Sequence, residues 1–124
     1  MNELTKAEEE IMQVLWQLDK AFVKEVVEQL PEPKPAYNTV STIIRILEKK
    51  GFVDHEAFGK SHRYFPLIEK EDYSKQSLTK FAKGYFDGSF KSMVSFFVNE
   101  NKLSTKDLDQ ILQEIKSNKE NELD

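Results

Sequence analysis

Apolar residues at the spacing of one helical face mark the start of the chain. The stretch Leu4–Leu18 repeats them every three or four positions, a period that gathers side chains on one stripe of a helix. Thr5 and Glu8 form a capping-box pattern, and the acidic run 8–10 is interpreted as solvated helix surface. We predict a first helix with this buried stripe: Leu4, Ala7, Ile11, Val14, Leu15 and Leu18.

Two more helices are predicted before residue 51. After a connector at Asp19–Phe22, the stretch Val23–Leu30 places four apolar residues on one face. Three prolines between residues 31 and 35 prevent the helix from continuing. The third helix begins near Tyr37 and ends at Gly51, where two lysines precede a residue free to adopt the left-handed conformation. Its buried stripe is Val40, Ile43, Ile44 and Leu47.

A β-hairpin is predicted after the third helix. Aromatic and β-branched residues alternate with polar ones in 52–58 and 62–67, and Gly59-Lys60 between them is a turn signal. The tip is expected to carry Lys60 and Arg63. Three helices followed by a hairpin have the order of a winged helix-turn-helix domain. The predicted fold class is therefore mainly α with a small β-hairpin wing.

The outward face of the third helix carries small polar and basic side chains and no carboxylate, a composition that suits phosphates and base edges. About thirteen residues of helix rise roughly 20 Å, and the major groove of DNA is about 12 Å wide, so the helix fits lengthwise. Two alternatives stay open: the polar back that any packed helix shows, and a module that binds another protein. The face consists of Asn38, Ser41, Thr42, Arg45 and Lys49.

Three helices are predicted in the second half of the chain, and their apolar side chains cannot all be buried among these helices alone. A helix over 72–86 ends at Asp87-Gly88, and Ser89 and Ser104 are placed to cap the next two. The stretch 90–98 is too apolar for one solvated face, so burial against a second copy is expected; folding back onto the first half is the alternative. The predicted dimerisation residues are Phe81, Phe86, Phe90, Met93, Val94, Phe97, Leu108, Ile111, Leu112 and Ile115.

Composition and charge narrow the function classes. The net charge of −4 argues at first against nucleic-acid binding, but the charged residues are unevenly distributed along the chain. Residues 1–33 hold three lysines against eight acids, a net −5, whereas residues 34–63 hold six basic residues against three acids, a net +3. The basic excess therefore coincides with the predicted DNA-reading unit. Without a long apolar run or an N-terminal signal sequence, a cytoplasmic protein is expected.

Catalytic and metal chemistry are not expected. The absence of cysteine removes thiolate ligands and disulfides. His55 and His62 are predicted to lie diagonally across the hairpin, but two imidazoles leave a metal site short of ligands. No nucleophile elbow or phosphate-cradling glycine loop occurs in the sequence, so we predict no catalytic residues, no cofactor and no metal.

Several motifs, taken together, resemble one known family. LTKAEEEIMQVLW, LEKKG, RYFPL, the GSF before an apolar helix and the LS before the last helix follow the order and spacing seen in the penicillinase repressor (BlaI/MecI/CopY) family. The resemblance implies a winged-helix domain at 1–68 and a helical dimerisation region at 69–124. It also implies a homodimer bound to an inverted-repeat operator of double-stranded DNA, blocking transcription until a signal inactivates it.

The resemblance also implies roles for individual residues. Asn38, Thr39, Ser41, Thr42 and Arg45 match the recognition-helix surface of the family, and Lys60 and Arg63 match its wing. Well-known members carry basic residues at the positions of Asn38, Ser41 and Ile46, so their operator sequence is not carried over.

The resemblance further implies a mode of release. In the β-lactam-responsive branch, a membrane sensor protease triggers cleavage of an Asn-Phe bond in the apolar helix, and the matching pair here is Phe96-Phe97. The Phe is kept and the Asn is not. The copper-responsive branch uses C-terminal cysteines, which this chain lacks, so copper sensing is not expected.

Overall fold

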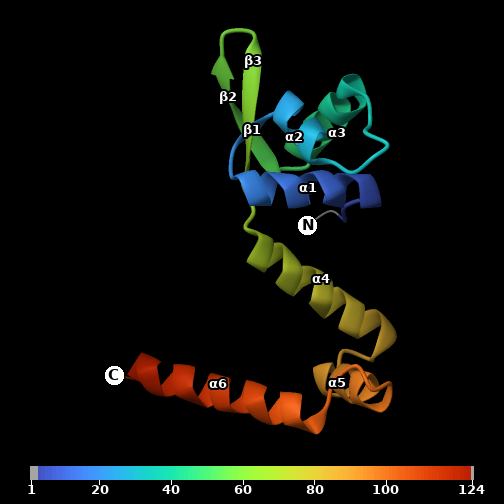
Figure 1. Ribbon diagram of the computed structural model, residues 1–124, viewed down its shortest axis with the longest axis vertical. Coiled ribbons are helices and arrows are strands. Elements are labelled where there is room, and N and C mark those ends of the chain that lie inside the picture. The colour runs from blue at the N-terminus through green and yellow to red at the C-terminus, as the bar shows by residue number, and fades with distance from the viewer. Residues whose placement is uncertain (1–2, 124) are drawn as a thin grey trace. The chain divides into compact units, whose positions relative to one another are not determined.

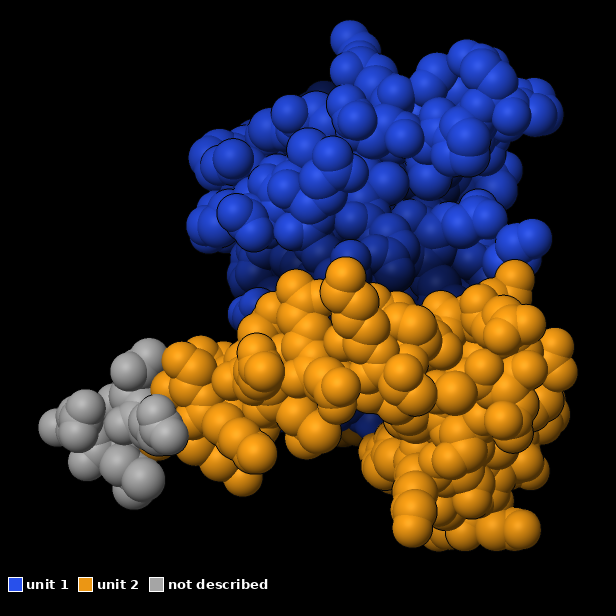
Figure 2. Space-filling view, turned by 60° about the horizontal axis from the view of Figure 1, so that its bottom comes forward, with its two compact units in different colours: residues 1–75 blue, residues 76–124 orange. Residues whose placement is uncertain are grey.

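The computed structural model describes residues 3–123, with side chains through residue 119. The chain divides into two compact units, residues 1–75 (unit 1) and residues 76–124 (unit 2) (Figure 2). Within unit 1, helices and a small sheet share one core, which confirms the predicted winged-helix fold class. In chain order (Figure 1) the elements are α1 (Lys6–Leu18), β1 (Ala21–Phe22), α2 (Val23–Gln29), α3 (Tyr37–Lys49), β2 (Val53–Phe58), β3 (Ser61–Pro66), α4 (Lys70–Tyr85), α5 (Phe90–Asn99) and α6 (Thr105–Leu123).

The start of α1 shows the predicted capping box. The Glu8 backbone N–H donates to Thr5 Oγ1 at 3.2 Å, and the Thr5 N–H donates to Glu8 Oε1 at 2.7 Å. Two backbone donors that the first helical turn leaves unpaired are thereby satisfied. The stripe behind the cap is buried at Ile11, Met12, Val14 and Leu15.

Glu8 is buried rather than solvated, contrary to the interpretation of the acidic run. Its Oε1 also accepts a hydrogen bond from Lys50 Nζ at 2.8 Å, and the same ammonium group contacts the Glu3 carbonyl at 3.3 Å. Burial by itself raises the pKa of Glu8, but the bonds from Lys50 and Thr5 outweigh it and hold that pKa below its usual value. This ion pair ties the start of α1 to the residue that ends α3.

The connector before α2 contains a short strand that the sequence analysis did not predict. Ala21 pairs with Tyr64 and Phe22 with Arg63, so the sheet has three antiparallel strands in the order β1-β3-β2. Ala21 is fully buried. A two-residue strand shows no alternating pattern in the sequence, and its partner lies in the distant hairpin.

The third helix and the hairpin match their predictions closely. Val40, Ile44 and Leu47 of α3 are fully buried, and Gly51 after its end has a φ of +85°. β2 and β3 pair antiparallel from Val53↔Pro66 to Phe58↔Ser61. Gly59 at the turn has a φ of +61°, which favours glycine. The core combines buried residues of α1, α2 and α3 with Ala21, Val53 and Tyr64 of the sheet; Figure 1 shows the arrangement of these elements.

The first turns of α4 belong to unit 1. Trp16 Nε1 donates to the Ile68 carbonyl at 2.8 Å, just before α4 begins. The Tyr73 ring lies 5.7 Å from the Trp16 ring and 5.9 Å from the Phe52 ring, and its hydroxyl donates to Glu9 Oε1 at 2.8 Å. These contacts explain why the division between units falls inside α4, whereas the sequence analysis placed the boundary before it.

Unit 2 has well-formed helix caps but almost no buried core. Ser89 Oγ accepts from the Ser92 N–H at 3.1 Å, and Ser104 Oγ accepts from the Asp107 N–H at 3.0 Å, as predicted. Among residues 76–119, whose side chains are described, only Ala82 is buried. Within the described part of the chain, no helix combines the length and apolar character needed to cross a membrane.

Candidate nucleic-acid interface

One face of α3 presents polar and basic side chains to solvent. Asn38, Thr39, Thr42, Arg45 and Lys49 are all exposed, as the sequence analysis expected of them. The Thr42 hydroxyl donates to the Asn38 carbonyl one turn earlier at 2.9 Å. The acid of this helix, Glu48, is half-buried and directed toward the hairpin, where it contacts His55. The exposed face of α3 therefore carries no carboxylate.

Ser41 does not lie on that exposed face. Its side chain is buried, with 7% of the residue accessible, and its Oγ accepts a hydrogen bond from Arg45 Nη2 at 3.1 Å. The sequence analysis counted Ser41 among the outward residues because it lies at the edge of the polar stripe. In the structure, Ser41 instead holds the Arg45 guanidinium one turn further along the helix.

The two basic residues of the hairpin occupy different environments. Lys60 follows Gly59 at the tip and is exposed. Arg63 lies further down β3, opposite Glu56 on one side and Phe22 on the other, and is half-buried. Its Nε is buried and has no hydrogen-bond partner within the described residues. The expectation that the tip carries both residues is therefore correct for Lys60 and wrong for Arg63.

A cleft of about 700 Å³ lies between α3 and the hairpin. Arg45 and Ser41 line it from α3, Lys60 from the hairpin tip, and Lys24 from the start of α2. Three cationic side chains, together with the Glu25 carboxylate, thus line one cleft beside the outward face. The sequence analysis missed Lys24, because no helical pattern indicates that the start of α2 lies next to the hairpin.

The hydroxyl of Tyr64 forms a neutral part of this cleft. The residue is 4% exposed, and burial together with the nearby Glu48 carboxylate raises its pKa above the usual value, although Arg45 acts in the opposite direction. Tyr64 therefore stays protonated at neutral pH and adds no negative charge to the cleft.

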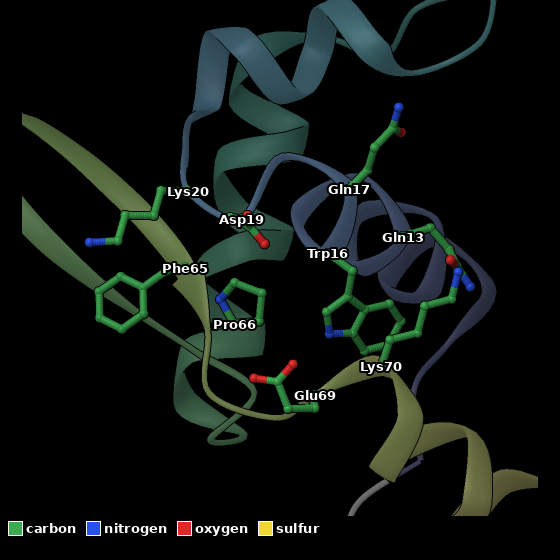
Figure 3. A pocket seen from close by; sticks show the side chains of 9 residues that line it. All are labelled: Gln13, Trp16, Gln17, Asp19, Lys20, Phe65, Pro66, Glu69 and Lys70. Atoms are coloured by element: carbon green, nitrogen blue, oxygen red, sulfur yellow. The ribbon is translucent and has the colours of Figure 1, made fainter. Parts of the chain in front are cut away.

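A second cleft, of about 660 Å³, lies on another part of unit 1 (Figure 3). The Trp16 ring, Pro66 and Glu69 surround it, and its charged side chains have both signs: Asp19, Lys20, Glu69 and Lys70. Lys20 is already paired with Glu56 at 3.1 Å and lies 5.6 Å from the centre of the Phe65 ring. Its two acidic and two basic side chains balance, whereas the cleft beside α3 is lined by three cationic side chains and one carboxylate, so α3 and the hairpin are the better candidate interface for a polyanion.

Three potential metal ligands meet where α3 approaches β2. Glu48, Asp54 and His55 each offer one ligand atom, and these atoms lie within 4.8 Å of one another. The two histidines considered in the sequence analysis, His55 and His62, have stacked rings with centres 4.1 Å apart. Asp54 is the sequence neighbour of His55, whereas Glu48 is brought beside His55 only in the folded chain.

The chain is similar to known proteins over nearly its whole length. The sequence profile described as penicillinase repressor matches residues 4–117. The methicillin resistance regulatory protein MecI of Staphylococcus aureus (strain N315) is 29% identical over 110 residues, covering 88% of this chain and 89% of that protein. The penicillinase repressor of Bacillus licheniformis is 27% identical over 118 residues, covering 94% and 92%.

A solved structure resembles somewhat more than half of the chain. The solution structure of the DNA-binding domain of the repressor BlaI matches with a TM-score of 0.50 and 30% sequence identity, covering 57% of this chain and 88% of that domain. Since the family profile covers nearly all of the sequence and the fold agrees with it, the chain belongs to the penicillinase repressor family, a family of winged-helix transcriptional repressors.

Proposed function

We propose that this repressor is a homodimer that binds an inverted-repeat operator, with α3 in the major groove and the hairpin on the neighbouring backbone. The observation that carries this proposal is the exposed face of α3, which is free of carboxylates and adjoins a cleft shared by Arg45 and Lys60. A helix with these side chains satisfies phosphate oxygens and base edges without repulsion. The relatives named as a regulatory protein and as a repressor support a regulatory, non-catalytic role.

The side chains of the interface have different tasks in this proposal. Arg45 reads a guanine through two parallel hydrogen bonds, and Ser41 orients its guanidinium. The outward polar residues Asn38, Thr39 and Thr42 contact base edges or phosphates, while Lys49 and Lys60 contact phosphates. Arg63 supports the wing from within the sheet because its side chain is half-buried.

Dimerisation through unit 2 accounts for apolar surface that this unit leaves uncovered. Three of the predicted dimerisation residues on α6 are exposed, Ile111, Leu112 and Ile115, and so are Phe81, Phe90 and Phe97. Phe86, Met93, Val94 and Leu108 are only half-buried. Each fully buried side chain of this size contributes roughly 1.5–3 kcal/mol, so a second copy stabilises unit 2 substantially. A two-fold dimer also matches a palindromic operator with recognition helices about 34 Å apart.

Release by proteolysis fits the position of the Phe96-Phe97 bond. Both residues lie in α5 and are exposed, with 47% and 36% accessible. A cut there removes apolar side chains from the proposed dimer surface and so lowers operator affinity. A membrane sensor protease is the proposed partner. Mass spectrometry of the chain from induced cells should show fragments ending between Met93 and Asn99, and an intact chain under induction would contradict this mode of release.

A binding titration tests the proposed function. The full chain is titrated into labelled duplex DNA from upstream of its own gene, and into a scrambled duplex, at about 50 and 200 mM salt. For about four phosphate contacts we expect a loss of about 10²-fold in affinity between these salt concentrations, together with a clear preference for the natural sequence. Equal binding to both duplexes, or no binding, would favour the protein-interaction module instead.

A further inference from the structure

The contact between α3 and β2 contains an arrangement of ligand atoms that DNA binding does not use. His55 Nδ1 lies 2.5 Å from Glu48 Oε2 and 3.9 Å from Asp54 Oδ1. We propose that Glu48, Asp54 and His55 bind one divalent transition-metal ion, of the zinc, cobalt or nickel class. The ion joins the last turn of the recognition helix to the first strand of the wing.

The separations of these atoms fit a metal ion. With zinc bonds of about 2.0–2.2 Å to nitrogen and oxygen, two ligands of a tetrahedral site lie roughly 3.3 Å apart. The two observed distances, 2.5 and 3.9 Å, lie on either side of that value. Asp54 Oδ1 also accepts a hydrogen bond from the His55 backbone N–H at 2.8 Å, so ion binding requires both carboxylate side chains to rotate. The imidazole favours a transition metal over magnesium or calcium, which prefer oxygen ligands alone.

The imidazole ring is already held in the orientation that the site requires. The His62 ring stacks on the His55 ring at 4.1 Å with an interplanar angle of 10°, and the Tyr64 ring lies 5.6 Å away. These contacts fix the plane of His55 with Nδ1 toward Glu48. Ligand orientation by neighbouring groups raises metal affinity, so only the carboxylates need to adjust.

Neighbouring cations do not occupy the two carboxylates. Among the described residues, the ion pairs of Glu48 and Asp54 are made with His55. Arg45, one turn before Glu48, is bonded to Ser41, and Lys50 is bonded to Glu8. Two carboxylates around one imidazole leave negative charge that a dication neutralises. The side chains of Glu48, His55 and Asp54 are 30%, 29% and 58% accessible, so an ion can reach them from solvent.

The ion has a consequence for the repressor. It fixes the hairpin relative to α3 and adds positive charge on the helical turn that carries Arg45 and Lys49. Operator affinity should therefore rise when the ion is bound. This consequence rests on the proposed function, whereas metal binding itself does not, so the two are tested separately.

Cobalt and zinc titrations test the site. The full chain is freed of metal with a chelator, and Co²⁺ is added while visible absorption is recorded; Zn²⁺ binding is followed by calorimetry. We expect one equivalent of each ion per chain, and a rise in melting temperature with Zn²⁺. Glu48→Gln and His55→Gln should each weaken binding at least about 10-fold and abolish that rise.

Matched variants separate these ligands from their neighbours on the hairpin. Glu56→Gln makes the same charge change on β2, where Glu56 pairs with Lys20, and should leave metal binding unchanged. His62→Gln removes the ring that orients His55, so it should keep one equivalent per chain and weaken binding less than His55→Gln does. The site is overturned if Co²⁺ produces no saturable absorption change, or if Glu48→Gln and His55→Gln bind as well as the unchanged chain. Metal binding without any change in operator affinity would overturn only the regulatory consequence.

Discussion

Arg45 is the residue of α3 best suited to read a base, because a guanidinium donates two parallel hydrogen bonds to guanine. Arg45→Ala should weaken operator binding by about 1–3 kcal/mol and relax the preference at one base pair. Arg45→Lys keeps the charge but loses the paired bonds, so it should lose preference more than affinity. Equilibrium binding to the operator and its single-base variants measures both. Undiminished discrimination by Arg45→Ala would show that this side chain reads no base.

Glu8 predicts a pH-dependent contribution to stability. Because the fold lowers its pKa, the ionised form is favoured in the folded state. The contribution is present above the pKa of the unfolded chain and is lost as the pH falls through the lower folded pKa. Glu8→Gln should reduce the free energy of unfolding by about 1–3 kcal/mol at pH 7. The difference from the unchanged protein should shrink below about pH 4.

Urea unfolding at several pH values measures this contribution. Glu10→Gln is the control, since Glu10 lies on the same helix and is exposed; it should change stability little at any pH. A difference between Glu8→Gln and the unchanged protein that stays constant from pH 7 to pH 3 would contradict the role of the Lys50 pair.

At the residue scale, the sequence predicted which side chains of α3 are exposed better than it predicted which distant residues pair with one another. The helical period placed Asn38, Thr42 and Arg45 correctly on the outward face of α3. Ser41 lies at the boundary of that face, where a small rotation decides between solvent and the hairpin. The buried Glu8 pairs with Lys50, which follows the end of α3 and lies 42 residues away in the sequence. Pairings between distant residues leave no periodic signal in the chain.

At the scale of elements, the hairpin tip should contribute a phosphate contact through Lys60. Lys60→Ala is expected to weaken binding of all duplexes to a similar degree and to lower the slope of log affinity against log salt by about 1. Lys102→Ala, which removes an exposed lysine of unit 2, is the control and should leave the slope unchanged. If Lys60→Ala also leaves it unchanged, the wing does not contact the DNA backbone.

The packing of the first turns of α4 on unit 1 depends on Tyr73. Tyr73→Ala removes a ring that contacts Trp16 and Phe52 and should cost about 2–4 kcal/mol of unfolding free energy. Tyr73→Phe keeps the ring and removes the hydroxyl that bonds to Glu9, so about 1 kcal/mol is expected. Chemical denaturation compares the two variants. Equal losses would mean that the hydroxyl, and not the ring, holds α4 in place.

Local signals explain which elements were predicted from the sequence. The starts of α1, α5 and α6 are recognisable in the sequence from their N-cap residues. These are Thr5, Ser89 and Ser104, whose side chains cap the helix that follows. The hairpin is marked by Gly59 and by alternation on both sides. β1 was missed because its two residues become a strand only when β3 lies beside them.

At the scale of the whole molecule, the exposed apolar surface of unit 2 predicts that dimerisation and DNA binding are lost together. Leu112→Asp places a charge where 52% of an apolar residue is accessible. Sedimentation should then show a monomer, and operator affinity should fall by about 10²-fold or more, because the two half-sites no longer bind as one. Gln110→Asp makes a similar change on the polar side of α6 and should remain dimeric. A dimeric Leu112→Asp protein would place the subunit contact elsewhere.

The division of the chain was only partly predictable from the sequence. The spacing and number of apolar residues predict a first half with its own buried core and a second half whose apolar side chains are poorly buried. The exact boundary does not, since α4 is one continuous helix whose first turns pack on unit 1 through Tyr73. A change of packing partner within a helix leaves its period unaltered.

The most direct test of the account is a selection of binding sites by the full-length chain from a pool of random DNA duplexes. Enriched duplexes should contain an inverted repeat whose half-site centres lie about 10 base pairs, or a multiple of that spacing, apart. Arg45→Ala should weaken the enrichment at one position in each half-site. A pool that stays random, or that enriches a single unrepeated site, would contradict a dimeric repressor that reads DNA through α3.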